Sequence, residues 1–255
     1  ALVQRAGELG LSGLAILDVD GMYSAVQAAT AGRSHGLPII HGSELTLAPL
    51  EFQERAVLPG RRRGGIPVRH RLDAGTGLPP GSDDPGIRLP VLATSQVGYH
   101  DLCSLLSTHF LSTPGRRKAQ LDLEEIQQVT RASSSVDLIA LTGTSRGPLQ
   151  RAVRAHGLKA GRSVLERLKD VFGADGVAVE LNLRTNQLGG PGQVDPMWRR
   201  LALLADEAGI PLVATGAVRM ATPQKSQLVD VLGATRLNQS LAEAEPQLPA
   251  WRTFL

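Results

Sequence analysis

Cysteine, aromatic residues and long apolar runs are all scarce in this chain of 255 residues. The single cysteine, Cys103, excludes a disulfide within one chain and a zinc site built from several thiolates. No apolar run is long enough to span a membrane, and the N-terminus lacks the layout of a signal peptide. We therefore expect a cytoplasmic protein with no membrane partner.

The low aromatic content also limits how the core can be built. Aromatic residues make up 3% of the chain and apolar residues 42%, so the core has to consist mainly of Leu, Val, Ile and Ala. The formal charge of +3 is too small to imply nucleic-acid binding by itself. The one dense basic run, Arg61–Arg63, lies among glycines and prolines, which is typical of a solvated loop.

Short apolar runs alternate with helical patterns along most of the chain, which predicts an α/β fold with a parallel sheet. We expect one domain over residues 1–255, with an irregular insert at about 49–86, where Gly, Pro, Arg and Asp dominate. Six core strands are expected, over residues 14–17, 38–47, 89–93, 136–141, 177–181 and 210–215.

The segment Gly13–Gly21 is an apolar run that ends in two aspartates and a glycine. This pattern predicts a strand that delivers polar side chains to the mouth of a barrel. Asp18 and Asp20 are two residues apart, so they would share a strand face and could hold an ion; the alternative is that they shape the turn that follows. His41 and Glu44 are three apart, so on a strand they face opposite sides and cannot share a site. His35, His109 and His156 lie near expected helix ends, where solvation or capping is the expectation.

Five fragments, taken in order, resemble the PHP (polymerase and histidinol phosphatase) domain of bacterial C-family DNA polymerases, the DNA polymerase III alpha subunit type. The insert and the segment Ser240–Ala244 are most similar to the error-prone alpha subunits of actinobacteria. The fragments are Leu17–Tyr23, Gly36–Pro38 with Gly42–Leu45, Val91–Ala93 with Gly98–Leu102, Leu141–Gly147, and Gly209–Arg219.

The resemblance implies a distorted TIM-like (β/α)7 barrel whose first strand is missing from this chain. We therefore expect a fragment of a protein that continues on both sides. Intact members hold zinc or manganese in a cluster of His, Asp, Glu and Cys ligands. Here the resemblance implies a degenerate metal site, with no catalytic residue and no cofactor of its own; the vestigial ligand positions are Asp18, Val19, Glu44, Arg88, Thr144, Ala217 and Arg219.

At these positions Glu44 alone is an assured ligand, because Val19, Thr144 and Ala217 have lost the ligand chemistry and Arg88 and Arg219 would repel a cation. We expect these residues to gather at the C-terminal ends of the strands. We also expect Arg88 or Arg219 to form an ion pair with Glu44 or Asp18.

The leading hypothesis is a metal-free, non-catalytic scaffold within an error-prone DNA polymerase alpha subunit. The resemblance then implies a parent protein that is a DNA-directed DNA polymerase (a nucleotidyltransferase) acting in DNA replication, repair and translesion synthesis, with Mg in a polymerase domain absent from this chain. The expected partner is the polymerase core of the same polypeptide, with DNA contacted only indirectly. The alternative is a PHP-type metal-dependent phosphoesterase or 3′–5′ exonuclease with a reduced metal set. A third possibility is a stand-alone remnant that only binds a partner.

Overall fold

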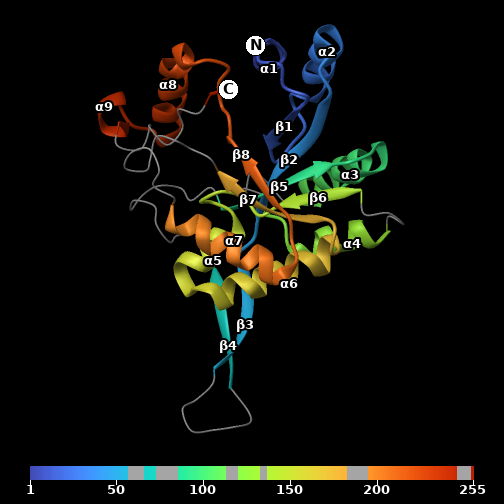
Figure 1. Ribbon diagram of the computed structural model, residues 1–255, viewed down its shortest axis with the longest axis vertical. Coiled ribbons are helices and arrows are strands. Elements are labelled where there is room, and N and C mark those ends of the chain that lie inside the picture. The colour runs from blue at the N-terminus through green and yellow to red at the C-terminus, as the bar shows by residue number, and fades with distance from the viewer. Residues whose placement is uncertain (57–65, 73–85, 113–119, 133–136, 183–194, 246–253) are drawn as a thin grey trace.

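A curled sheet of six strands forms the centre of the computed structural model, with helices packed around it (Figure 1). The structure describes residues 1–56, 66–72, 86–112, 120–132, 137–182, 195–245 and 254–255. The six expected core strands are confirmed, with ends shifted by a few residues. In spatial order they are β1 (Leu14–Val19), β2 (Ile39–Leu47), β5 (Ile87–Ala93), β6 (Leu138–Leu141), β7 (Val177–Asn182) and β8 (Leu212–Thr215).

The helices follow the apolar periodicity of the sequence, and local signals set their ends. The helix α7 is the clearest case: Asp195 accepts a hydrogen bond from the backbone N–H of Met197 at 2.8 Å, and Gly209 ends the helix with a φ of 64°. The α7 helix itself is Pro196–Ala208, and the others are α1 (Leu2–Glu8), α2 (Ala25–His35), α3 (Gln96–Ser112), α4 (Leu123–Ala132), α5 (Pro148–His156), α6 (Leu158–Phe172), α8 (Ser226–Leu237) and α9 (Leu241–Ala244), with a 3₁₀ turn η1 (Pro223–Lys225). No helix in the described ranges is long and apolar enough to cross a bilayer.

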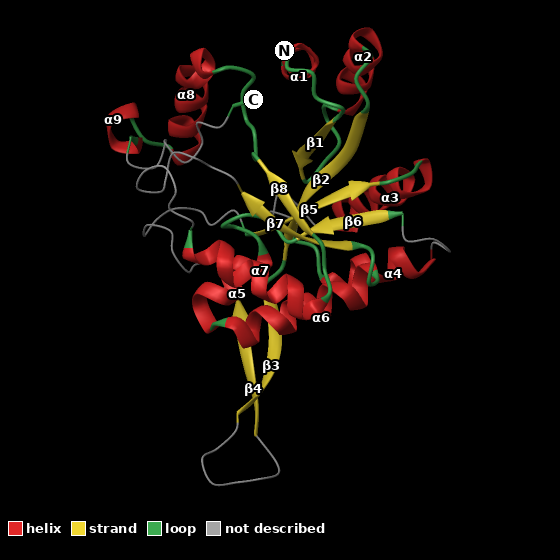
Figure 2. Ribbon diagram, in the orientation of Figure 1, coloured by secondary structure: helices red, strands yellow, loops and turns green. Residues whose placement is uncertain are grey.

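The main core lies between the sheet and the helices α3 to α7, which pack around it (Figure 2), and it is largely aliphatic, as the composition predicts. Leu45 and Leu89 from the sheet and Leu201 from α7 are fully buried there, and Phe172 is the largest fully buried side chain among the described residues. A second, smaller cluster joins α1 and α2 to the first two strands through Val3, Ala6 and Leu37.

The strand directions differ from the expected parallel sheet at one strand. β1 and β2 are parallel, and so are β6, β7 and β8, but β5 runs antiparallel to both of its neighbours, β2 and β6. The reason is the connection: in its described part the chain between β2 and β5 forms two strands and no crossover helix, and a parallel partner would require such a helix. The start of β5 therefore lies at the same edge as the ends of the other five strands.

The expectation of an irregular insert over 49–86 is wrong for two stretches of it. β3 (Leu50–Ala56) and β4 (Ile66–Leu72) form an antiparallel pair that projects from the body of the molecule (Figure 1). The sequence Leu-Glu-Phe-Gln alternates apolar and polar residues, and Ile66 and Val68 are two residues apart, as strand periodicity requires. The basic run 61–63 and the rest of the insert, 57–65 and 73–85, lie outside the described residues.

The two ends of the sheet, β1 and β8, do not pair with one another, so the described strands form an open, curled half-barrel. The mixed α/β architecture agrees with the predicted barrel class. The seventh strand of the predicted (β/α)7 barrel stays a prediction.

Candidate functional site

Polar side chains lie close together within the curled sheet, at the edge of the sheet where five strands end and β5 begins. The register shows why: Val19 pairs with Glu44 across β1 and β2, and Thr46 pairs with Arg88 across β2 and β5. Arg88 reaches this edge only because β5 is reversed. The carboxyl ends of barrel strands are where sites are usually built, so this edge is the candidate site.

Arg88 forms an ion pair at this edge, but with a different partner from those expected. Its Nη1 donates to Oδ2 of Asp20 at 3.1 Å, where the prediction named Asp18 or Glu44. The same Nη1 donates to the hydroxyl of Thr46, and that hydroxyl donates in turn to Asp20. The backbone N–H of Thr46 donates to Oδ1 of Asp20 at 2.6 Å. Asp20 has a φ of 49°, a left-handed conformation that Asp tolerates better than most residues and that turns it out of β1.

Asp18 shapes the turn between β1 and α2. Its Oδ2 accepts hydrogen bonds from both the backbone N–H and the hydroxyl of Ser24, each at 2.7 Å. The hydroxyl of Ser43 donates to the carbonyl of Asp18 and accepts from the backbone N–H of Gly21. Of the two interpretations of the aspartate pair, turn formation is therefore the one that holds for Asp18.

Sequence reasoning missed the most deeply buried acid of the site, Glu180 on β7, which is 4% exposed. The hydroxyl of Thr215 donates to its Oε1, and its Oε2 has no hydrogen-bond partner in the described part of the chain. Burial raises the pKa of Glu180, and the negative charge of Glu44 raises it further, although the Thr215 hydroxyl and the backbone of Gly143 oppose the shift. Asn182, on the same face of β7, is 9% exposed, and neither of its amide atoms has a partner there.

The remaining predicted positions contribute little to this cluster. Val19 ends β1 and is 39% exposed, and Thr144 is half-buried in the turn after β6. Ala217 is exposed and Arg219 lies two residues further along, both beyond the end of β8. Arg88 lies near the start of β5 and not at the C-terminal end of a strand, where it was predicted. In the described part of the chain it is the one vestigial position that joins the hydrogen-bonded network of Asp20 and Thr46.

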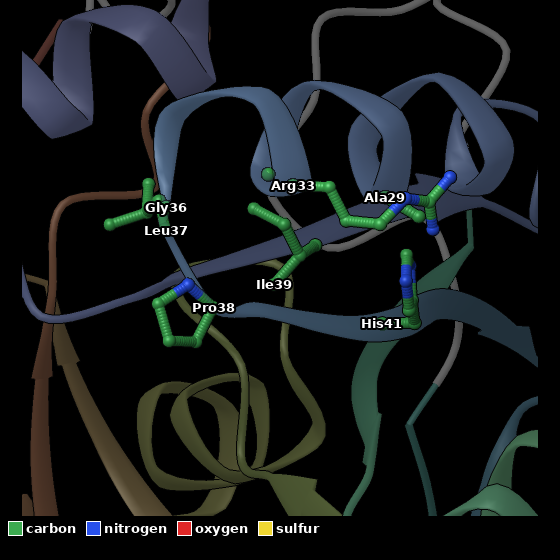
Figure 3. A pocket seen from close by; sticks show the side chains of 8 residues that line it. Ala29, Arg33, Gly36, Leu37, Pro38, Ile39 and His41 are labelled. Atoms are coloured by element: carbon green, nitrogen blue, oxygen red, sulfur yellow. The ribbon is translucent and has the colours of Figure 1, made fainter.

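The histidines lie away from this edge. His35 and His156 end α2 and α5, as expected. His109 lies in the last turn of α3 and is buried, with its Nδ1 3.5 Å from Oε2 of Glu125, so solvation, one of the two roles expected for it, is wrong. His41 lies near the start of β2 in a shallow groove beside α2, where its side chain and that of Arg33 reach toward one another (Figure 3).

No group of three or more His, Cys, Asp or Glu side chains in the described ranges could hold a metal ion. The strand-end cluster, defined as Asp20, Thr46, Arg88, Glu44 and Glu180, instead contains one ion pair and two further carboxylates. With a guanidinium fixed among them, the donor set does not fit the several divalent ions of an intact family site.

The family profile described as "PHP domain" matches residues 1–184. The chain belongs to the PHP domain family. Two curated relatives are both named error-prone DNA polymerase. The one from Cutibacterium acnes is 32% identical over 97% of this chain and 19% of its own length, and the one from Nocardia farcinica is 32% identical over 95% and 22%. This PHP chain therefore spans about a fifth of the length of the curated relatives it matches.

Among solved structures, the PHP chain is similar to a candidate metal-dependent phosphoesterase from Bifidobacterium adolescentis. The identity is 14%, the match covers 84% of this chain and 79% of the other, and the TM-score is 0.42.

Proposed function

We propose that this PHP domain is a non-catalytic scaffold within an error-prone DNA polymerase, where it packs against and supports the polymerase core of the same polypeptide. The observation that carries the proposal is the Arg88–Asp20 ion pair inside the curl. A guanidinium that is 7% exposed holds a fixed positive charge among the strand ends, where the family places its metal ions. Bringing a divalent cation beside this charge is unfavourable in a partly desolvated site.

The donor chemistry at the vestigial ligand positions supports the same interpretation. Zinc and manganese require imidazole, thiolate or carboxylate ligands, and among these positions Asp18 already accepts two hydrogen bonds from Ser24. Glu44 remains, but one carboxylate is too few for the ions of an intact site. The metal cluster of the family therefore does not fit the residues present at these positions.

The first test is elemental analysis of the purified chain, with assays of phosphomonoester and DNA 3′-end hydrolysis in added manganese. We expect substoichiometric zinc and manganese and no turnover above that of an Arg88→Met/Glu44→Gln variant. Stoichiometric metal, or turnover that Glu44→Gln abolishes, would overturn the scaffold proposal.

One observation favours the alternative, a phosphoesterase or exonuclease with a reduced metal set. Glu44 lies close enough to Glu180 for its charge to raise the pKa of Glu180, and Oε2 of Glu180 has no partner among the described residues. Two carboxylates with a vacant oxygen could ligate a single ion. If this is the function, Glu180→Gln and Glu44→Gln should each remove the bound metal and the activity together.

The supporting role is tested in the whole polymerase polypeptide. Phe172 is fully buried, and truncating such a side chain typically costs about 3–5 kcal/mol of folding free energy. We expect Phe172→Ala to lower the temperature at which primer extension is lost, because the polymerase core loses its support. If Phe172→Ala leaves the temperature of heat inactivation unchanged, the polymerase core does not depend on the PHP domain.

A further inference from the structure

The helix α8 carries its large apolar side chains on the outside. Leu228, Val231 and Leu232 are 58%, 47% and 60% exposed, and Thr235 continues the same face one turn later. The spacing i, i+3, i+4 and i+7 is that of an apolar stripe, which on a surface helix normally faces the core. We call these four residues the α8 stripe.

The buried residues of α8 lie away from this stripe. Gly233 and Ala234 are buried, and the helix contacts η1 before it and α9 after it. Figure 1 shows α8 and α9 set apart from the helices that cover the sheet. The buried residues of α8 are therefore small, and its larger apolar residues remain exposed. Such an exposed apolar patch indicates an interaction surface.

The region that contains α8 is shared with a longer DNA polymerase. The PHP family profile ends at residue 184, before α8, whereas the polymerase from Cutibacterium acnes aligns over 97% of the chain. The unaligned 3% is roughly eight residues, so α8, which ends at Leu237, lies within the aligned part. The α8 region is thus common to this chain and to polymerases about five times its length.

We propose that the α8 stripe is the surface on which the polymerase core of the same polypeptide docks, through an apolar helix or sheet face of that core. This inference rests on the proposed scaffold function. A tethered partner has an effective concentration in the millimolar range, so a small apolar contact is sufficient. A second copy of the chain fits less well, because a stable dimer usually buries more than about 1,000 Å², and three apolar side chains fall short of that.

The test compares hydrogen exchange of the backbone amides in α8 between the 255-residue chain and the whole polymerase polypeptide. We expect exchange in α8 to be at least tenfold slower in the whole polypeptide. A Leu228→Asp/Leu232→Asp variant of the whole polypeptide should lose this protection and lower the midpoint of heat inactivation of primer extension. The matched control is Val26→Asp on α2, a site that is 79% exposed, and it should change neither.

Equal exchange in α8 in the two proteins would overturn the inference even without a variant. If Phe172→Ala still destabilised primer extension in that case, the scaffold function would stand and only the docking surface would be wrong. Light scattering tests the other occupant: a concentration-dependent dimer of the 255-residue chain that becomes a monomer in the Leu228→Asp/Leu232→Asp variant would assign the stripe to a second copy.

Discussion

Replacing Asp20 in the Arg88–Asp20 ion pair should lower the free energy of unfolding more than replacing Arg88. The Arg88 side chain is 7% exposed and that of Asp20 is 25% exposed. Truncating one partner of a buried pair costs about 3–5 kcal/mol, since the other charge is left uncompensated. Asp20→Asn leaves the guanidinium of Arg88, the more deeply buried of the two charges, without its partner. We therefore expect a loss of folding free energy near that full range.

Arg88→Met keeps most of the apolar stem and leaves Asp20 with the backbone N–H of Thr46, which donates at 2.6 Å. Because water also reaches Asp20, the expected loss is smaller, about 1.5–3 kcal/mol. The double variant removes both charges, so the two losses should not add, and a coupling of about 2–3 kcal/mol is expected.

The assay is urea unfolding followed by circular dichroism, for the unmodified chain, both single variants and the double variant. Arg33→Met, at an exposed position on α2, serves as the control and should stay within about 0.5 kcal/mol of the unmodified chain. A coupling below about 0.5 kcal/mol would refute the reasoning. So would an Arg88→Met variant that is less stable than Asp20→Asn.

Two further changes test the strand-end cluster and the sheet. The pKa of Glu180 is raised above its usual 4.5, mainly by burial, so the folded chain loses stability as pH rises from that value through the raised pKa. Glu180→Gln should therefore gain stability relative to the unmodified chain above pH 4.5 and not below it, and urea midpoints that keep a constant difference across this range of pH would contradict this. A Cβ at Gly42 would lie 2.4 Å from the carbonyl oxygen of Val91 on β5, so Gly42→Ala should lower the free energy of unfolding by about 1–3 kcal/mol or more. Gly7→Ala in α1, where the nearest atom is 3.9 Å away, is the control and should be neutral or slightly stabilising in the same unfolding assay.

The sequence was sufficient to place the six core strands and most helices, because their apolar periodicity is strong and glycines mark several of the ends. It could not give the direction of β5, since periodicity carries no information on which way a strand runs. The β3–β4 pair was missed because the Gly-, Pro- and Arg-rich composition around it outweighed two short alternating stretches.

At the site, the resemblance named Arg88 as a vestigial ligand position, but it gave neither the place of Arg88 near the start of β5 nor its partner. Asp18 and Asp20 are equivalent in a strand pattern, and only the left-handed turn at Asp20 decides which carboxylate meets the guanidinium. Glu180 carried a signal that went unused: it is an acid within the otherwise apolar run Val177–Leu181. An ionisable residue in a buried strand is unusual enough to name as a site candidate.

The register between β2 and β5 makes the segment that connects these two strands in the chain a favourable place for insertions. Leu47, the last residue of β2, pairs with Ile87, the first residue of β5, so the chain leaves and re-enters the sheet at neighbouring points. Lengthening a loop whose ends are already held together costs little, about 0.6 kcal/mol for each doubling of its length. Homologues can therefore differ widely in size here without disturbing the sheet. The same property makes the far end of the β3–β4 pair suitable for grafting a fluorescent or affinity module into an otherwise unchanged chain.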